Sequence, residues 1–215
     1  MIDQITTPTF AVEDPATLEV VGHVRDLGPA YARAAVDRAA AAFSSWSRAA
    51  PRRRADVLRR AYELMLRDRD ELATLISREN GKSVQDATNE VVYAAEFFRW
   101  YSEEAVRADG EYGNSPAGEA RTIVTRRPVG VAALVTPWNF PAAMATRKIG
   151  PALAAGCTAV VKPAALTPLT MLAIAEILGE AGLPEGALEV VTTRSSGAVV
   201  SAWMEDDRVR KISLI

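Results

Sequence analysis

The segment VTPWNFPAAMATRK, residues 135–148, places an asparagine between two prolines at the end of an apolar run. Pro137 and Pro141 fix their own φ angles, so the loop gives up little entropy when it holds the Asn139 side chain in one orientation. A preorganised amide donor of that kind can stabilise an oxyanion, and losing one typically costs about 3 kcal/mol in barrier height. An asparagine ahead of a helix can equally cap that helix. This segment alone leaves both interpretations of Asn139 open.

A lysine follows a second apolar run. Lys162 ends the segment TAVVK and stands before Pro163, Ala164 and Ala165. Its ammonium group has three N–H donors, which suit the hydroxyls of a ribose or the oxygens of a phosphate. The alternative is a lysine whose aliphatic stem lies along the rim of a core while its charge reaches solvent. The residue types alone are compatible with either role for Lys162.

The single cysteine and the single histidine of the sequence are not expected in the site. Cys157 lies in LAAGCTAVV, where small apolar neighbours and the lack of a nearby base indicate a buried structural thiol. His23 has no carboxylate at a useful spacing and is expected at the surface. One residue of each type is too few for a disulfide framework or a classical zinc site, so no metal is predicted.

Apolar segments alternate with helical ones after residue 128. The apolar segments are residues 130–136, 158–164, 188–193 and 209–215, and helices are expected at 142–155, 168–180 and 196–205. Unbroken apolar runs are typical of strands buried on both faces, and their alternation with helices predicts a parallel, Rossmann-like α/β sheet. Ligands bind outside the carboxyl ends of such strands, where TPWN and KPA follow the first two. The GxGxxG fingerprint of many dinucleotide sites is missing.

The first half of the chain is predicted to be largely helical. Apolar residues recur at helical spacing in residues 29–47, 51–81 and 84–106, and Gly81 stands where a glycine would end a helix. The arginines at 52–60 are interpreted as a solvated helix face rather than as an anion-binding patch.

Two further segments complete a division of the chain into four parts. Residues 1–28 mix polar residues and prolines with one β-like run, TLEVVGHV, and are expected to form an extended arm. Residues 109–127 pass from Gly, Pro and Asn into a β-like segment, as a hairpin arm would. Residues 29–108 are then expected to form a helical part, and residues 128–215 a βαβ sheet.

Composition narrows the classes of partner. The 215 residues are 49% hydrophobic, which is typical of a globular protein, and 25 basic against 27 acidic residues leave no strongly basic surface for nucleic acid. No apolar run is long enough to span a bilayer, and the N-terminus does not have the pattern of a signal peptide. We expect a cytoplasmic protein that binds neither nucleic acid nor a membrane.

The motifs at 135–148 and 158–164 belong to a longer pattern. Residues 126–192, RRPVGVAALVTPWNFPAAMATRK through KPAALTP to GALEVVT, resemble the aldehyde dehydrogenase superfamily, and within it the succinate-semialdehyde dehydrogenase branch most of all. RENGK and YAAEFFRWYSEEAVR, further upstream, resemble the same family. The resemblance therefore covers nearly the whole chain, and PWNFP followed by KPA at this spacing is a specific signature.

The resemblance implies roles for the first loop. Asn139 would donate its side-chain amide to the oxyanion that forms when a thiolate attacks an aldehyde. Trp138 would line the cofactor channel together with Thr136 and Pro137. Arg147, in TRK, would bind the distal carboxylate of a short semialdehyde substrate, because a guanidinium group pairs with a carboxylate through two hydrogen bonds.

The second loop would hold the adenosine half of the cofactor. The resemblance implies that Lys162, with Pro163 and Ala164, binds the ribose. Members that prefer NAD often have a glutamate that accepts a hydrogen bond from the ribose 2′-hydroxyl, and this sequence has Ala165 there. Without that carboxylate a 2′-phosphate meets no repulsion, so the cofactor is expected to be NADP or NAD.

The family also uses a phosphate-binding loop and two catalytic residues for which this sequence has no counterpart. A Gly-Ser-Thr loop follows the fourth strand in the family, and a glutamate base and a cysteine nucleophile come later. Here Leu214 and Ile215 already depart from the pattern, and Thr193 stands where many relatives have glycine. Without a thiolate no thiohemiacetal forms, so the isolated chain is expected to be an inactive, incomplete form of the fold. Complete members are homo-oligomers, whereas an unpaired last strand favours association or aggregation.

Two alternatives to a truncated enzyme remain. The chain could be a non-catalytic nucleotide-binding or subunit-interaction module, which would pair with a longer partner through the hairpin at 110–127. A broken reading frame would leave it without any function.

Overall fold

A computed structural model of the chain describes residues 7–214. Its centre is a sheet of four parallel strands in the order β7-β6-β5-β8. The strands are β5 (Val131–Val135), β6 (Thr158–Lys162), β7 (Leu188–Val190) and β8 (Val209–Ser213). The predicted strands and their parallel pairing are therefore confirmed.

The strand order creates a switch point beside β5. The chain moves outward from β5 to β6 and β7, and it then returns to place β8 on the other side of β5. In open α/β sheets, ligands bind at the carboxyl ends of the strands next to such a reversal. The loop that contains Asn139 leaves the carboxyl end of β5.

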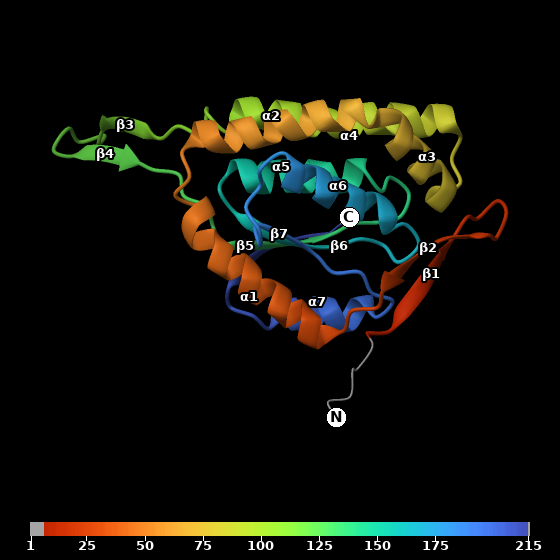
Figure 1. Cartoon of the computed structure of the whole chain (residues 1–215). Helices are drawn as coiled ribbons and strands as arrows, with labels where there is room; N and C mark the ends of the chain where they lie inside the picture. The colour runs from red at the N-terminus through yellow and green to blue at the C-terminus, as the bar shows by residue number, and fades with distance from the viewer. Residues whose placement is uncertain (1–6, 215) are drawn as a thin grey trace.

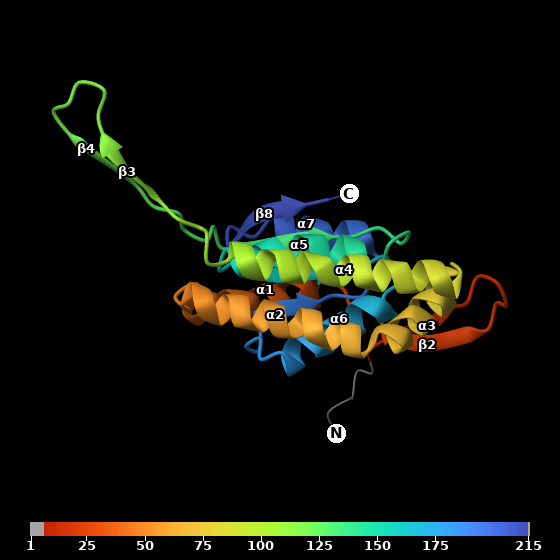
Figure 2. The ribbon, with the colours of Figure 1, turned by 90° about the horizontal axis from the view of Figure 1, so that it is seen from above.

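Helices cover both faces of the sheet (Figure 1). One face carries α5 and α6, with α2, α3 and α4 as a further layer, and the other face carries α1 and α7. Seen from above, α4 runs along α5 while α2 lies along α6 (Figure 2). The helices are α1 (Pro29–Trp46), α2 (Pro51–Arg67), α3 (Arg69–Asn80), α4 (Val84–Glu104), α5 (Ala143–Ala154), α6 (Leu169–Glu180) and α7 (Ser196–Met204).

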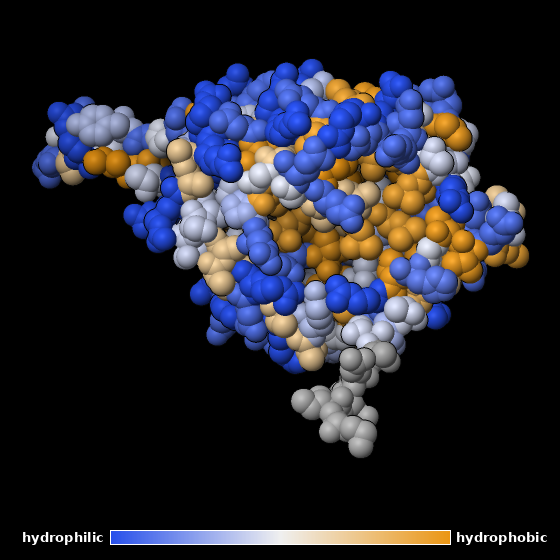
Figure 3. Space-filling view, viewed as in Figure 1, coloured by the Kyte–Doolittle hydropathy of each residue, from blue (hydrophilic) through white to orange (hydrophobic). Residues whose placement is uncertain are grey.

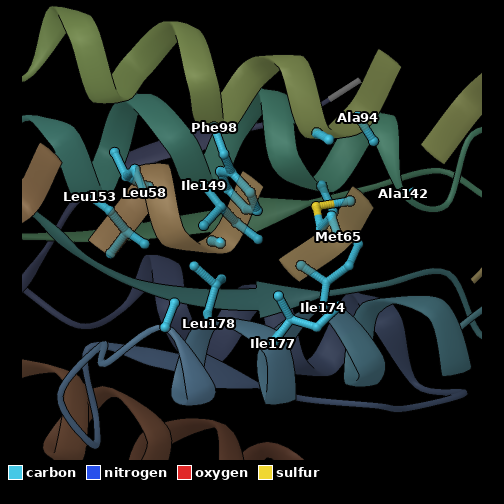
Figure 4. Packing of buried hydrophobic residues seen from close by; sticks show 14 of the residues in the cluster. Leu58, Met65, Ala94, Phe98, Ala142, Ile149, Leu153, Ile174, Ile177 and Leu178 are labelled. Atoms are coloured by element: carbon cyan, nitrogen blue, oxygen red, sulfur yellow. The ribbon is translucent and has the colours of Figure 1, made fainter. Parts of the chain in front are cut away.

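Alternation along the strands divides the core in two. On β6, Ala159 and Val161 face the larger cluster, which lies against the helices α2 to α6 (Figure 4). Val160 faces the smaller cluster on the side of α1 and α7, where the Trp203 indole donates to the Ala32 carbonyl at 3.1 Å. Both faces of β6 are thus buried, and this explains why the segments that form such strands are apolar at successive residues. Residues labelled in the larger cluster include Leu58, Met65, Phe98, Ile149, Leu153, Ile174 and Leu178.

The helical segment 51–81 differs from its prediction as one helix. It divides at Asp68 into α2 and α3, whose axes turn relative to each other (Figure 1). Gly81 ends α3 in the left-handed conformation, with φ of 83° and its N–H donating to Ser77, as predicted.

The arginine run at 52–60 is only partly the solvated face that was predicted. Arg54 is buried, and its Nε donates to the Ala154 carbonyl at 2.9 Å while Nη1 donates to the Ala49 carbonyl at 2.5 Å. Burial lowers the pKa of Arg54 from its usual value. The reason for the burial is that the last carbonyls of α5 need donors, and a guanidinium group supplies several in one plane.

The predicted extended arm is a docked hairpin within the residues that the structure describes. Strands β1 (Thr9–Glu13) and β2 (Val20–Arg25) pair antiparallel, so one of the two strands was missed. Phe10, Val12 and Val24 are buried against Ala165, Leu169 and Leu172. Figure 3 shows the apolar residues that gather over α6 and alongside this hairpin. Residues 1–6 of the predicted arm lie outside the described range.

The second hairpin projects from the body, as predicted (Figures 1 and 2). It consists of β3 (Glu111–Asn114) and β4 (Arg121–Val124). Tyr112 and Ile123 are cross-strand partners, and each is 70% exposed. Within residues 7–214 no helix combines the length and the apolar composition needed to cross a bilayer.

Gly81 offers a test of how the helical layer is joined to the N-terminal hairpin. A Cβ atom added at Gly81 would lie 2.7 Å from Cγ of Pro15, and the positive φ is unfavourable for any residue with a side chain. We predict that Gly81→Ala lowers the free energy of unfolding by about 2 kcal/mol. Urea denaturation measures this change.

Gly179→Ala is the matched control, because Gly179 lies in α6 with nothing near its missing Cβ. This control is expected to leave stability unchanged or to raise it by up to about 1 kcal/mol. Equal effects of the two substitutions would show that neither the left-handed conformation nor Pro15 constrains residue 81.

Candidate functional site

Two loops meet where β5 and β6 end. Val135 pairs with Lys162 in the sheet, and the Thr136 N–H donates to the Lys162 carbonyl at 3.2 Å. The first loop continues through Asn139 to α5, and the second continues through Ala165 to α6. The two predicted ligand segments are therefore neighbours at one edge of the sheet.

Glu90 of α4 supplies the N-terminal cap of α5. The N-cap residue is Ala142, whose side chain cannot accept a hydrogen bond. Instead, Oε1 of Glu90 accepts the backbone N–H groups of Ala142 at 2.9 Å and Ala143 at 3.2 Å. Asn139 does not cap this helix, so the structural alternative for its side chain is wrong.

Lys82 extends this contact to the Asn139 loop. Its Nζ lies 2.5 Å from Oε2 of Glu90, donates to the Asn139 carbonyl at 3.0 Å, and lies 4.2 Å from the centre of the Phe140 ring. Asn80 donates from Nδ2 to the Trp138 carbonyl at 2.8 Å. The backbone of the loop is thus fixed at two successive carbonyls.

The Asn139 side chain itself is available to a ligand. The residue is exposed, and its amide group makes no hydrogen bond to any of the residues 7–214. A fixed backbone with a free N–H₂ donor is the arrangement that an oxyanion site requires.

Glu79 of α3 supplies the corresponding cap for α6. The N-cap residue of α6 is Pro168, which cannot cap the helix through its side chain. Oε2 of Glu79 accepts the Leu169 N–H at 2.8 Å and Oε1 accepts the Thr170 N–H at 2.9 Å. Burial raises the pKa of Glu79 to about 7, against the opposite effect of hydrogen bonds from Thr170 and Leu169.

Lys162 is buried rather than extended to solvent. It is 4% exposed, and its Nζ donates to the Pro163 carbonyl at 2.9 Å and to Oγ of Ser196 at 3.1 Å. Burial lowers the pKa of Lys162. The snorkelling alternative is therefore wrong, and the ammonium group lies beside the start of α7.

A cavity of about 440 Å³ lies between the two loops and the β1–β2 hairpin. Trp138 and Ala165 line it, whereas Asn139 and Lys162 do not. The physical reason is the alternation of strand side chains, because Lys162 follows Val160 on the face of α1 and α7, while the Asn139 loop turns toward α3 and α4. Asn139 and Lys162 therefore lie at the same edge of the sheet without lining this cavity together.

Arg147 belongs to another cavity. It is exposed on α5, and its guanidinium carbon lies 5.3 Å from the centre of the Phe97 ring. The cavity beside it has a volume of about 410 Å³ and is also lined by Lys148, Lys211 and the buried Cys157. Arg147 Nη1 donates to Sδ of Met144 at 3.9 Å, and the other N–H groups of this exposed guanidinium make no hydrogen bond to any of the residues 7–214.

The sequence interpretation missed the residues that hold the loops, which are Glu79, Asn80, Lys82 and Glu90. One signal was present in the sequence. Glu90 occupies the apolar face of its helix, at helical spacing from the buried residues Ala87, Val91 and Ala94. A charged residue at such a position requires a buried partner.

Known proteins match both the sequence and the fold. A family model described as "Aldehyde dehydrogenase family" matches residues 2–215. The mitochondrial succinate-semialdehyde dehydrogenase of Homo sapiens is 46% identical over 207 residues, which are 95% of this chain and 39% of that protein. The succinate-semialdehyde dehydrogenase of Paenarthrobacter nicotinovorans is 50% identical over 180 residues, which are 84% of this chain and 40% of that protein.

A solved structure gives the same result. The crystal structure of an E. coli NADP dependent enzyme superimposes with a TM-score of 0.93 at 43% identity, over 95% of this chain and 42% of that one. The 215 residues thus span about two fifths of the length of the relatives they match.

The cap at Glu79 predicts a pH dependence of stability. The pKa of Glu79 is near 4.5 when exposed and about 7 when folded, so between these values the folded state holds a proton that the unfolded state releases. Stability from this group is therefore full below pH 4.5 and is lost as the pH rises to 7, by about 3 kcal/mol in total. Chemical denaturation at a series of pH values measures the slope for the wild type and Glu79→Gln.

Glu79→Gln should lack the loss of stability between pH 4.5 and 7. Glu176→Gln, at an exposed site on α6, is the control and should keep it. Parallel pH profiles for the wild type and Glu79→Gln would contradict a raised pKa at this cap.

Proposed function

The chain belongs to the aldehyde dehydrogenase family, and from this we propose that it forms the cofactor-binding part of an NAD(P)-dependent dehydrogenase that oxidises a short semialdehyde to the acid. Succinate semialdehyde is the first candidate substrate, because the two relatives above are named succinate-semialdehyde dehydrogenase and the exposed guanidinium of Arg147 has further N–H groups for a distal carboxylate. The observation that carries the proposal is the Asn139 loop, whose backbone is fixed while its amide donor is free.

The residues present fit a dinucleotide. Lys162 has a buried ammonium group beside the Ser196 hydroxyl at the start of α7, and no carboxylate within residues 7–214 bonds to it. A buried cation near the positive end of a helix lacks compensating charge until an anion binds. A phosphate or ribose of the cofactor would supply that partner.

The two ends of the cofactor would lie on different sides of the rim. Lys162 would hold the adenosine ribose from the side of α7, and Ala165 would face its 2′ position from the cavity that Trp138 also lines. A dinucleotide is an extended ligand, so Asn139 and Lys162 can serve one cofactor without lining one cavity. The bound nicotinamide would supply the hydride acceptor for the tetrahedral adduct that forms when a nucleophile adds to the aldehyde.

Asn139 would act on the oxygen of the substrate. Its amide N–H₂ would donate to the oxyanion as charge develops there, in a position held by the loop backbone. Arg147 would bind the carboxylate at the other end of the substrate. The nucleophile would come from a residue other than Cys157, which is buried at the amino end of β6, away from the rim. We therefore propose that residues 1–215 alone bind the cofactor without turning over aldehyde.

The exposed hairpin favours a second function. Tyr112 and Ile123 place two apolar side chains next to each other on a projecting arm. Such a pair is more stable when another surface covers it. The chain would in that case also be a subunit-interaction module of a homo-oligomer, and this role is compatible with cofactor binding.

The cofactor site predicts the binding of adenosine 2′,5′-bisphosphate. Lys162→Ala should abolish binding because it removes the buried cation, whereas Lys211→Ala, on β8 beside the other cavity, should leave affinity unchanged. Isothermal titration calorimetry measures both. Unchanged affinity in Lys162→Ala would remove this lysine from the site.

Ala165→Glu tests the preference for a 2′-phosphate. A new carboxylate in the cavity between the two loops and the β1–β2 hairpin should weaken binding of the bisphosphate at least about tenfold relative to binding of adenosine 5′-monophosphate. That factor corresponds to about 1.4 kcal/mol. Ala41→Glu on the exposed face of α1 is the control for added charge. Equal weakening of the two ligands would contradict a 2′-phosphate beside Ala165.

A further inference from the structure

Glu90 is a buried charge that the proposed chemistry does not use. It is 3% exposed on the face of α4 that packs against α5, among apolar side chains. A carboxylate in such a place is unfavourable unless each of its oxygens has a partner. Both oxygens have one: Oε1 accepts from Ala142 and Ala143 at the start of α5, and Oε2 accepts from Lys82, which in turn donates to the Asn139 carbonyl.

We propose that Glu90 is the positioning residue for Asn139, holding both ends of residues 139–142 with a single carboxylate. The inference rests on the proposed function, since it assigns to Asn139 the role of oxyanion donor. Glu90 would touch neither substrate nor cofactor, and it would act through the backbone.

One end of the segment is held directly. Oε1 of Glu90 accepts the N–H groups of Ala142 and Ala143, at 2.9 Å and 3.2 Å. First-turn N–H groups have no acceptor within their own helix, and the side chain of Ala142 supplies none. The carboxylate therefore fixes where α5 begins, and its negative charge is favourable at this end of a helix.

The other end is held through Lys82. Oε2 of Glu90 receives a bond from Lys82 Nζ, and the same Nζ donates to the Asn139 carbonyl at 3.0 Å. Lys82 also lies over the Phe140 ring, at 4.2 Å from its centre. Two bonds in succession thus connect α4 to the residue whose side chain is the proposed donor.

A role in packing alone would not need this chemistry. An apolar residue of similar volume would fill the space at no cost of desolvation, but it could neither cap α5 nor orient Lys82. Glutamine affects these two tasks differently, because its amide oxygen can still accept the two backbone N–H groups, though more weakly than a carboxylate, while its N–H₂ group cannot accept from Lys82.

The test uses the 215-residue protein and three variants. Glu90→Gln removes the link to Lys82, Lys82→Gln removes the cation and leaves Glu90 in place, and Glu96→Gln changes a partly exposed glutamate of the same helix as the control. Nuclear magnetic resonance measures the backbone order of Asn139 and the amide exchange rates of Ala142 and Ala143. The Ile149 amide, in the middle of α5, serves as the internal reference.

In Glu90→Gln the order parameter of Asn139 should fall from about 0.85 to below about 0.6. Exchange at Ala142 and Ala143 should rise at least about tenfold relative to Ile149, since an amide oxygen accepts more weakly than a carboxylate. Lys82→Gln should lower the order of Asn139 with little change at Ala142. The control should leave all three sites unchanged.

Two results would overturn the proposal. One is an Asn139 order parameter that stays at the wild-type value in Glu90→Gln. The other is faster exchange by the same factor at Ala142, Ala143 and Ile149, because a residue that contributes only to global stability accelerates them together. A wild-type protein that fails to bind adenosine 2′,5′-bisphosphate would refute the proposed function but would leave this test intact, since neither readout depends on a ligand.

Discussion

Two buried carboxylates on the outer helical layer hold the helices that follow the ligand loops. Glu90 caps α5 and Glu79 caps α6, and in each case the residue at the N-cap position, Ala142 or Pro168, cannot do so itself. A helix whose first N–H groups are buried without acceptors is strongly destabilised, so these caps are a requirement of the fold. The outer layer and the sheet are therefore one structural unit.

The same constraint explains where the candidate site residues lie. The caps fix where α5 and α6 begin. Each loop is therefore held at both ends, by the strand before it and by the capped helix after it. Arg54 completes this arrangement at the other end of α5 by donating to the Ala154 carbonyl. Strand alternation then sends Lys162 to the opposite face of the sheet, beside Ser196. The proposed site is thus a rim with two sides, suited to an extended ligand, rather than one enclosed pocket.

Local patterns in the sequence predicted much of this fold, and long-range partners were beyond them. The strands, the helices between them and the role of Gly81 follow from periodicity and from a glycine at a helix end. The burial of Arg54 and the roles of the two capping glutamates depend on contacts across 52 to 100 residues of sequence. Hydrophobic spacing reports which face of a helix is buried, but it does not identify the partner of a charge on that face. The sequence also placed Asn139 and Lys162 at one edge of the sheet, but the side on which Asn139 lies depends on the long-range bonds of its loop to Asn80 and Lys82.

The most direct measurement of the central claim is amide hydrogen exchange of the unmodified protein at Ala142, Ala143, Leu169 and Thr170. First-turn amides of an ordinary helix have only water as acceptor and exchange quickly. If Glu79 and Glu90 cap α6 and α5, these four amides should be protected to the same degree as amides in the middle of the two helices. Exchange at the rate of exposed amides would contradict the account.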